Sequence, residues 1–287
     1  MVQRIKNNFT AFIRRFWVLW GGLSALAGVW LSFVTWEDMG ITGKSDRIFI
    51  LLGVVLLSAI IAVVTVLCSK QKKIFGDVNK GVILSYDDII KIGFPQQEGL
   101  KKIVVIPVNR CFDLSCENNL ISRTSIHGQW IGQYIRSNEE RELIHQKIQQ
   151  FLNNSGAQFD VLTHENKKEG NLNRYKPGTV VELEGQHNVT FYLLALSALN
   201  KDLKAYCTEM EFCETLQGLI EYYDAHGQGE SLYCPIMGDH IVRPIHETKD
   251  ILNLMLSVFR FNNRKIHGKI HVIIYDKMKT DISILEY

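Results

Sequence analysis

The chain has 287 residues, of which 46% are hydrophobic and 22% are charged, and its formal net charge is +2. Of its 32 basic and 30 acidic side chains, six and three lie in residues 1–69, which leaves 26 against 27 for residues 70–287. Because a nucleic-acid-binding domain normally carries a basic excess or a basic face, we expect no nucleic-acid partner.

Two uncharged apolar spans, Trp17–Trp36 and Ile48–Cys68, lie near the start of the chain. Each has about 20 residues, which as a helix covers the ~30 Å hydrocarbon core of a bilayer. The short polar linker between them predicts a transmembrane helical hairpin in residues 1–73. A cleaved signal peptide fits less well, because the first span is longer than the apolar region of a signal peptide and a second span follows it.

Basic residues flank the hairpin on one side and set its expected orientation. The positive-inside rule then places both termini in the cytoplasm and predicts a multi-pass membrane protein in contact with lipid. Neither span contains an ionisable side chain, which argues against a pump or transporter. The flanking residues are Arg4, Lys6, Arg14 and Arg15 before the first span, and Lys70, Lys72 and Lys73 after the second.

Small residues recur at helical spacing in both spans. Such rows let helices approach closely in lipid, either within the hairpin or between two copies of the chain, and both interpretations stay open here. The residues are Gly21, Ala25, Gly28 and Ser32 in the first span, and Ser58, Ala62 and Thr65 in the second.

Residues 74–287 alternate between short apolar runs and amphipathic patterns. This alternation predicts a three-layer α/β/α domain around a largely parallel or mixed sheet. The polar stretch Asn153–Lys176 is predicted to be a surface excursion. The six cysteines contain no CxxC pair and are interpreted as reduced packing residues. Expected strands are Val82–Ser85, Ile103–Val108, Thr179–Glu184, Phe191–Ser197, Ser231–Ile236 and Lys269–Tyr275, and expected helices are His127–Ile135, Glu139–Leu152, Glu209–His226 and Thr248–Phe259.

Polar residues and glycines follow several of these strands, at the sheet edge where ligands bind in α/β folds. Asn109–Asp113 follows one strand, Ser125–Trp130 opens a helix, and residues 237–240 follow another strand. Glycine at such turns admits a phosphate close to backbone N–H groups. Each feature also has a structural interpretation, because turns need glycine, and Asn and Asp commonly cap them.

The motifs VVIPVN…FD, SxHGQ, PGTVVELE, FYLLALS, CPIMGD and VIIYD, in this order, resemble the macro domain of Thoeris antiphage effectors with two N-terminal transmembrane helices. The resemblance implies an N-terminal transmembrane hairpin followed by a macro-like domain with a mixed sheet, residues 74–287, in a bacterial inner membrane. It also implies an ADP-ribose-derived ligand, histidine-conjugated in this type, that a TIR-domain NAD-consuming partner makes during phage infection.

The resemblance assigns a binding role to thirteen positions. Asp88 would accept from the adenine amino group, Asn109 would contact the distal ribose, and Tyr275 would stack near the adenine. The other positions are Ile89 beside Asp88, Asp113, the first phosphate loop of Ser125, His127, Gly128 and Gln129, and the second loop of Met237, Gly238, Asp239 and His240. His-Gly-Gln replaces the usual run of glycines and Gly-Asp-His replaces Gly-x-Gly, which weakens the case for hydrolase activity.

No Ser-His-acid motif, HExxH helix or GxSxG elbow is present in the sequence, and no metal-ligand spacing stands out. We therefore expect no catalytic residues, no metal and no cofactor. The implied function is a ligand-gated effector that oligomerises, disrupts the membrane and aborts infection. A membrane-tethered ADP-ribosyl hydrolase is the alternative, and an anchored scaffold that needs no ligand is a third possibility.

Overall fold

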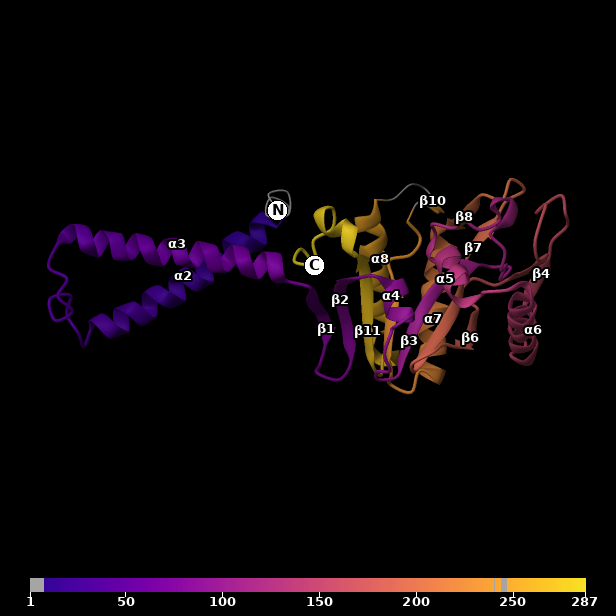
Figure 1. Cartoon of the computed structure of the whole chain (residues 1–287), viewed down its shortest axis with the longest axis horizontal. Coiled ribbons are helices and arrows are strands. Elements are labelled where there is room, and N and C mark those ends of the chain that lie inside the picture. The colour runs from indigo at the N-terminus through magenta and orange to yellow at the C-terminus, as the bar shows by residue number, and fades with distance from the viewer. Residues whose placement is uncertain (1–7, 240, 244–246) are drawn as a thin grey trace. The chain divides into compact units, whose positions relative to one another are not determined.

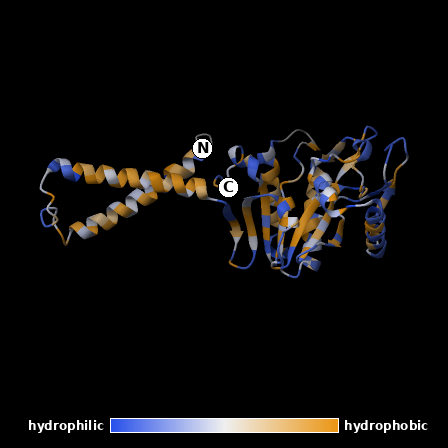
Figure 2. Cartoon of the chain, viewed as in Figure 1, coloured by the Kyte–Doolittle hydropathy of each residue, from blue (hydrophilic) through white to orange (hydrophobic). Residues whose placement is uncertain are grey.

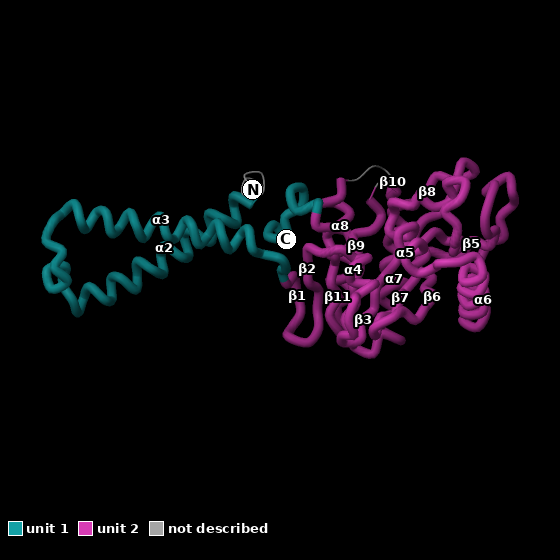
Figure 3. Tube along the Cα trace, in the orientation of Figure 1, with its two compact units in different colours: residues 1–72, 277–287 teal, residues 73–276 magenta. Residues whose placement is uncertain are grey.

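The computed structural model describes residues 8–239, 241–243 and 247–287. The chain forms two compact units (Figure 3), residues 1–72 with 277–287, and residues 73–276. Residues 277–287, which the sequence prediction grouped with the second domain, belong to the first unit.

The first unit contains two long helices, α2 (Phe9–Leu31) and α3 (Lys44–Cys68). Both are rich in apolar residues along their length (Figure 2). They pack against each other at one end, where Arg15 Nη1 donates a hydrogen bond to Ser69 Oγ at 3.2 Å. Residues 32–43, which form turns over much of their length, connect them.

The structure corrects the first predicted span. The helix starts at Phe9 and ends at Leu31, so Arg14 and Arg15 lie inside it and residues 32–36 form turns. About 16 residues remain between Arg15 and the helix end, or ~24 Å, which is short of the ~30 Å hydrocarbon core. Among the described residues, α3 is the helix that is long and apolar enough to cross a membrane. The described residues therefore contain one candidate span where the sequence predicted two.

The two rows of small residues have different surroundings. Ser58 and Ala62 of α3 are fully buried. A methyl group built on Gly21 or Gly28 of α2 would meet no atom within 4 Å. Ser58 and Ala62 therefore pack inside the unit, whereas Thr65 is exposed and the glycines of α2 face open space.

The C-terminal residues contact the start of α2 and the segment that follows α3. Ser283 Oγ contacts the Asn8 side chain at the start of α2, and both residues are buried. Lys72 Nζ donates to the backbone oxygens of Leu285, at 3.0 Å, and of Tyr287. Residues 277–287 thus tie the beginning of α2 to the segment that follows α3.

The second unit is built on a nine-stranded mixed sheet (Figure 1) in the order β1-β2-β11-β9-β3-β7-β8-β10, with β6 paired to β7. The central pairs are parallel, and β7 pairs antiparallel with β6 and β8. The strands are β1 Gln71–Gly76, β2 Gly81–Asp87, β3 Lys102–Asn109, β4 Phe159–Val161, β5 Asn173–Tyr175, β6 Val180–Glu184, β7 Val189–Leu199, β8 Ala205–Thr208, β9 Ser231–Pro235, β10 Val242–Arg243 and β11 Lys269–Tyr275, and β4 and β5 form a separate hairpin.

Helices cover both faces of this sheet because the central strands are apolar on both sides. On β3, Val104 and Ile106 belong to one core with α4, α5 and α6. Tyr192 of β7 instead packs edge-on against Tyr222 of α7. The helices are α4 Ile89–Gly93, α5 Ile126–Tyr134, α6 Asn138–Asn154, α7 Glu209–His226 and α8 Thr248–Phe261, with short 3-10 turns at η1 Glu117–Asn119, η2 Asn263–Lys265 and η3 Asp276–Thr280.

The six predicted strands and four predicted helices of this unit are confirmed within two residues or so at most ends. Sequence reasoning missed the edge strands β1 and β10, the short strand β8 and the five-residue helix α4. The predicted surface excursion Asn153–Lys176 is wrong in part, because it contains the β4–β5 hairpin and Lys167, whose side chain is fully buried.

Candidate functional site

A cavity of about 430 Å³ opens at the carboxyl ends of β3, β7 and β9. Its volume lies in the range of small-molecule sites, and its place is where ligands bind in α/β sheets. The described residues that line it are Pro107–Asn109 from β3, Asn119–Ser122, Ser125–His127 from the start of α5, Leu196, Ser197 and Leu199 from β7, Leu203, Ala205, and Ile236–Asp239 with Ile241 after β9.

The structure brings six of the thirteen predicted binding residues into this cavity: Asn109, Ser125, His127, Met237, Gly238 and Asp239. His240 lies outside the described residues. Asp88, Ile89, Asp113, Gly128, Gln129 and Tyr275 do not line it.

The predicted adenine residues lie at the start of α4 and at the end of β11. Asp88 caps α4, its Oδ1 accepting a hydrogen bond from the amide of Ile90 at 3.0 Å, and Ile89 is buried behind it. Tyr275 ends β11 beside Asp87 in the parallel register and is 44% exposed. Their binding roles stay predictions.

Ser125 determines how α5 begins. Its Oγ accepts from the amide of Gly128 at 3.1 Å and donates to the carbonyl of Ser122 at 2.7 Å. The Gly128 amide is therefore used by the cap, and its predicted place in the first phosphate loop stays a prediction. Glycine is needed there because a Cβ would lie 2.1 Å from the Ser122 oxygen. The amides of Ile126 and His127 remain at the helix start, where the helix dipole favours an anion.

Gly238 shapes the opposite wall. Its φ of +90° lies in the region that favours glycine, and its carbonyl accepts from the amides of Ile241 and Val242 at 3.2 and 3.0 Å. A Cβ there would lie 2.8 Å from both Phe212 and Val242. The sequence interpretation of a tight loop at this glycine agrees with this geometry.

Asn109 and His127 are buried polar residues of the cavity wall, 5% and 6% exposed. Asn109 Oδ1 accepts from the amides of Cys111 and Asp113 at 3.1 and 3.3 Å, which leaves Nδ2 as its available donor. Burial lowers the pKa of His127 to about 3, opposed by a hydrogen bond to the Asp113 carbonyl, so the ring is neutral. Its Nε2 is buried and has no partner in the described part of the chain.

The cavity wall carries little formal charge. Asp239 is the charged residue among the described lining residues, and its Oδ1 accepts from Thr248 Oγ1 at 3.0 Å. No Lys or Arg is found among these lining residues. An anionic ligand would therefore be held by backbone amides and the α5 terminus rather than by cationic side chains.

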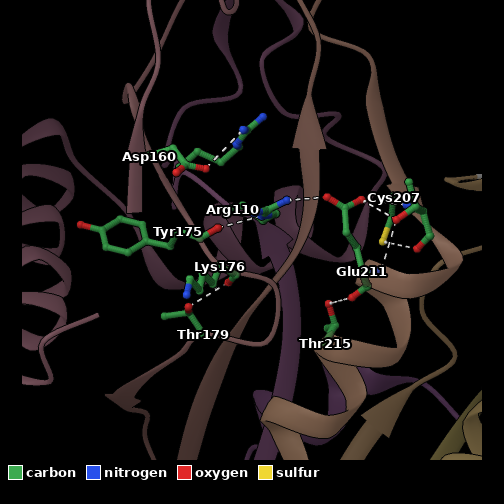
Figure 4. A network of polar contacts seen from close by, with 10 residues as sticks. Arg110, Asp160, Tyr175, Lys176, Thr179, Cys207, Glu211 and Thr215 are labelled. Carbon is green, nitrogen blue, oxygen red and sulfur yellow. Dashed lines mark hydrogen bonds and ion pairs between the residues drawn. The ribbon is translucent and has the colours of Figure 1, made fainter. Parts of the chain in front are cut away.

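A buried ionic network lies behind the β3 end (Figure 4). Arg110 Nη1 binds Glu211 Oε1 at 2.7 Å, and Arg110 Nε donates to the Tyr175 carbonyl at 2.7 Å. Glu211 also completes a capping box with Thr208 at the start of α7. Burial raises the pKa of the neighbouring Cys207 thiol to about 12, so this cysteine remains a protonated packing residue.

Sequence reasoning missed the Asn119–Ser122 wall and the apolar contribution of β7 and Leu203. One signal was present in the sequence, because the pair Asn118-Asn119 is typical of a turn. In the structure both residues have positive φ. No group of three or more His, Cys, Asp or Glu residues in the described ranges is arranged to hold a metal ion.

Comparison with known proteins identifies the family. The model of "Thoeris protein ThsA, Macro domain" matches residues 82–275, which contain the described cavity residues and most of the sheet. The curated protein "Thoeris protein ThsA" of Bacillus amyloliquefaciens (strain Y2) is 23% identical over 176 residues, covering 60% of this chain and 56% of that protein. The match thus spans little more than half the length of this relative. Because the family model covers more than half of the chain, the chain belongs to the macro-domain family of Thoeris ThsA proteins.

Proposed function

We propose that residues 73–276 are a sensor that binds an ADP-ribose-derived signal in the cavity at the carboxyl ends of β3, β7 and β9. Membership of the ThsA macro-domain family points to Thoeris antiphage defence. The observation that carries the proposal is the wall itself, in which the Asn109 amide, the α5 start and the Gly238 loop meet around one cavity.

The wall suggests how such a ligand would lie. Asn109 Nδ2 would donate to the distal ribose, and the amides at the start of α5 would face a phosphate. Gly238 and Asp239 would line the other side of the phosphate path. Asp88, whose Oδ1 caps α4, would use its other oxygen for the adenine amino group, with Ile89 and Tyr275 nearby.

The output of the sensor is proposed to occur at the membrane. The apolar helix α3 supports an anchor by its length and composition. A TIR-domain partner would supply the signal from NAD, and a histidine-conjugated form is expected. Ligand binding would shift the protein toward a self-associated state that disrupts the bacterial inner membrane and aborts infection.

The proposal is tested by titrating the full chain, purified in detergent, with ADP-ribose in a calorimeter. We expect saturable binding that is lost in Asn109→Ala and retained in the control Asn153→Ala, which lies exposed on α6. Wild-type protein that releases no heat with ADP-ribose, or an Asn109→Ala variant with unchanged affinity, contradicts this pocket. Incubation with ADP-ribosylated protein separates sensing from hydrolysis, because a sensor leaves the substrate intact.

A further inference from the structure

Asp113 does not line the cavity, yet its main chain holds two residues that do. Its amide donates to Asn109 Oδ1 at 3.3 Å, and its carbonyl accepts a hydrogen bond from the His127 imidazole. Because Nε2 of that ring has no partner among the residues that the structure describes, the bond to Asp113 is made by Nδ1. Asp113 therefore links the end of β3 to the start of α5.

The Asp113 carboxylate is itself fixed from the other side. Its Oδ2 binds Lys167 Nζ at 2.6 Å, and its Oδ1 accepts from the amide of Asn171 at 2.6 Å. Lys167 Nζ also donates to the Asn171 carbonyl at 2.7 Å, and Asn171 Nδ2 donates to the carbonyl of Cys111 at 3.0 Å. The carboxylate and ammonium side chains are 2% and 0% exposed.

This arrangement is demanding to build. A fully buried lysine loses its hydration and is tolerated only with a close counter-ion and further hydrogen-bond acceptors, both of which Lys167 has. Gly170, at φ +82°, admits the carboxylate, because a Cβ there would lie 2.3 Å from Asp113 Oδ1. The excursion that carries both residues thus packs against the rear of the cavity wall.

The consequence is a defined polarity at the wall. With Oδ1 of Asn109 engaged by backbone amides, its Nδ2 is a fixed donor. With Nδ1–H of His127 engaged by Asp113, its Nε2 is a fixed acceptor that is buried rather than exposed in the cavity. In the proposed function the Asn109 donor meets a hydroxyl oxygen of the distal ribose.

We propose that Lys167 is a positioning residue for ligand recognition, which acts through Asp113 to fix the His127 tautomer and to hold the Asn109 amide against the hydroxyl-bearing distal group of the ligand. This inference rests on the proposed function and deepens it. Lys167 itself does not touch the ligand.

The test compares ADP-ribose with ADP, which lacks the distal ribose, on the full chain in detergent. In Lys167→Met we expect ADP-ribose to bind about tenfold more weakly, the loss of one well-placed hydrogen bond, and ADP to bind within about twofold of wild type. The double variant Lys167→Met/Asp113→Asn removes both buried charges and keeps the protein folded if the single variant unfolds. Lys265→Met, which removes a half-exposed ion pair with Glu221, is the matched control.

A second readout reports positioning directly. The ¹⁵N shifts of the imidazole give the tautomer of His127, which we expect to be Nδ1–H in wild type and in Lys265→Met, and mixed in both Lys167 variants. Equal weakening of ADP-ribose and ADP, or an unchanged preference with an unchanged tautomer, overturns the positioning role. Wild-type protein that binds neither nucleotide instead refutes the proposed function, and the tautomer measurement still decides whether Lys167 positions His127.

Discussion

The polar side chains of the cavity wall divide their hydrogen-bonding atoms between the protein and the cavity. Asn109 gives its oxygen to two backbone amides, and Ser125 uses its hydroxyl to cap α5. Side chains fixed in this way lose little further conformational entropy when a ligand binds. Substitutions at these residues should therefore change affinity more than their few contacts suggest.

Gly238→Ala tests the conformation of the second loop. The new methyl group would meet Phe212 and Val242 at 2.8 Å, on a backbone whose φ of +90° is strained for alanine. We expect a loss of about 1–3 kcal/mol of stability and weaker ADP-ribose binding, because the loop must move away. Thermal melting and calorimetry measure the two effects, with Gly99→Ala, where a Cβ meets nothing, as the control. Unchanged melting and affinity in Gly238→Ala would contradict the assigned loop geometry.

His127 gives the folded protein a pH dependence whose sign can be derived. Burial lowers its pKa to about 3 in the folded state, against ~6.5 when unfolded, so the unfolded chain binds the extra proton as the pH falls. The free energy of unfolding should drop by up to ~1.4 kcal/mol per pH unit below about pH 6.

The measurement compares unfolding of wild type and His127→Gln at pH 7.5 and pH 5. The variant should lose less stability than wild type over this interval, whereas His164→Gln, at an exposed position, should follow wild type. Parallel losses in all three proteins would show that His127 titrates normally in the folded state.

At the scale of elements, the start of α7 is joined to the end of β3. Thr208 Oγ1 accepts from the amide of Glu211 at 3.2 Å, and the Glu211 carboxylate binds both the Thr208 amide and Arg110. Glu211 takes part in both the cap and the ion pair, so loss of the cap frees its carboxylate. The stabilities of the two elements are therefore coupled.

Thr208→Ala should lower the stability of the second unit by about 1 kcal/mol, because the helix loses its N-cap. Ser257→Ala on α8 is the control: Ser257 bonds the carbonyl four residues earlier, and alanine favours a helix interior. Thermal melting distinguishes the variants. A Thr208→Ala protein as stable as Ser257→Ala would mean that Glu211 holds Arg110 without help from the cap.

The elements that the sequence predicted are those whose apolar pattern is long. The strands β3 and β7 carry continuous runs buried on both faces, and α7 has a sustained helical period, so local pattern and tertiary burial agree. The end of α2 was misplaced because Ser32–Trp36 is apolar enough to continue a span, while Thr35 and Asp38 form a side-chain turn there instead.

The candidate site was predictable only in part, because a local sequence pattern locates strand ends but not contacts between distant residues. Residues that follow strands, such as Asn109 and Gly238, could be located from strand ends. Lys167 could not, because a lysine in a polar stretch normally stays in water, and its burial depends on a carboxylate 54 residues away in the chain. Long-range polar pairing leaves no periodic signal.

At the scale of the whole molecule, residues 277–287 connect the proposed ligand-binding unit to the unit that contains the helices. They follow β11, whose last residue is Tyr275, and they bind the start of α2 and Lys72 within the first unit. The second unit is therefore joined covalently to the first unit at two points, after α3 and after β11. A change at the β11 end can therefore reach the start of α2 along the chain and through the Ser283–Asn8 hydrogen bond.

Two matched substitutions distinguish one membrane crossing from two. Leu57 lies near the middle of α3 and Leu26 lies in the apolar part of α2, and both side chains are more than half exposed. A lysine at the centre of a spanning helix costs about 2.5–3.5 kcal/mol of insertion free energy, whereas at an interface it costs far less. The proposed hairpin predicts that Leu57→Lys and Leu26→Lys both reduce the fraction of chain retained in membranes after alkaline extraction.

An anchor made of α3 alone predicts a different result, in which Leu57→Lys is released and Leu26→Lys is retained. The distinction also decides topology, because two crossings place residue 1 and the macro domain on one side of the membrane, and a single crossing places them on opposite sides. Leu100→Lys, at a 91% exposed position of the second unit, controls for added charge. Retention of Leu57→Lys at the wild-type level would exclude α3 as a membrane span and remove the membrane from the proposed output.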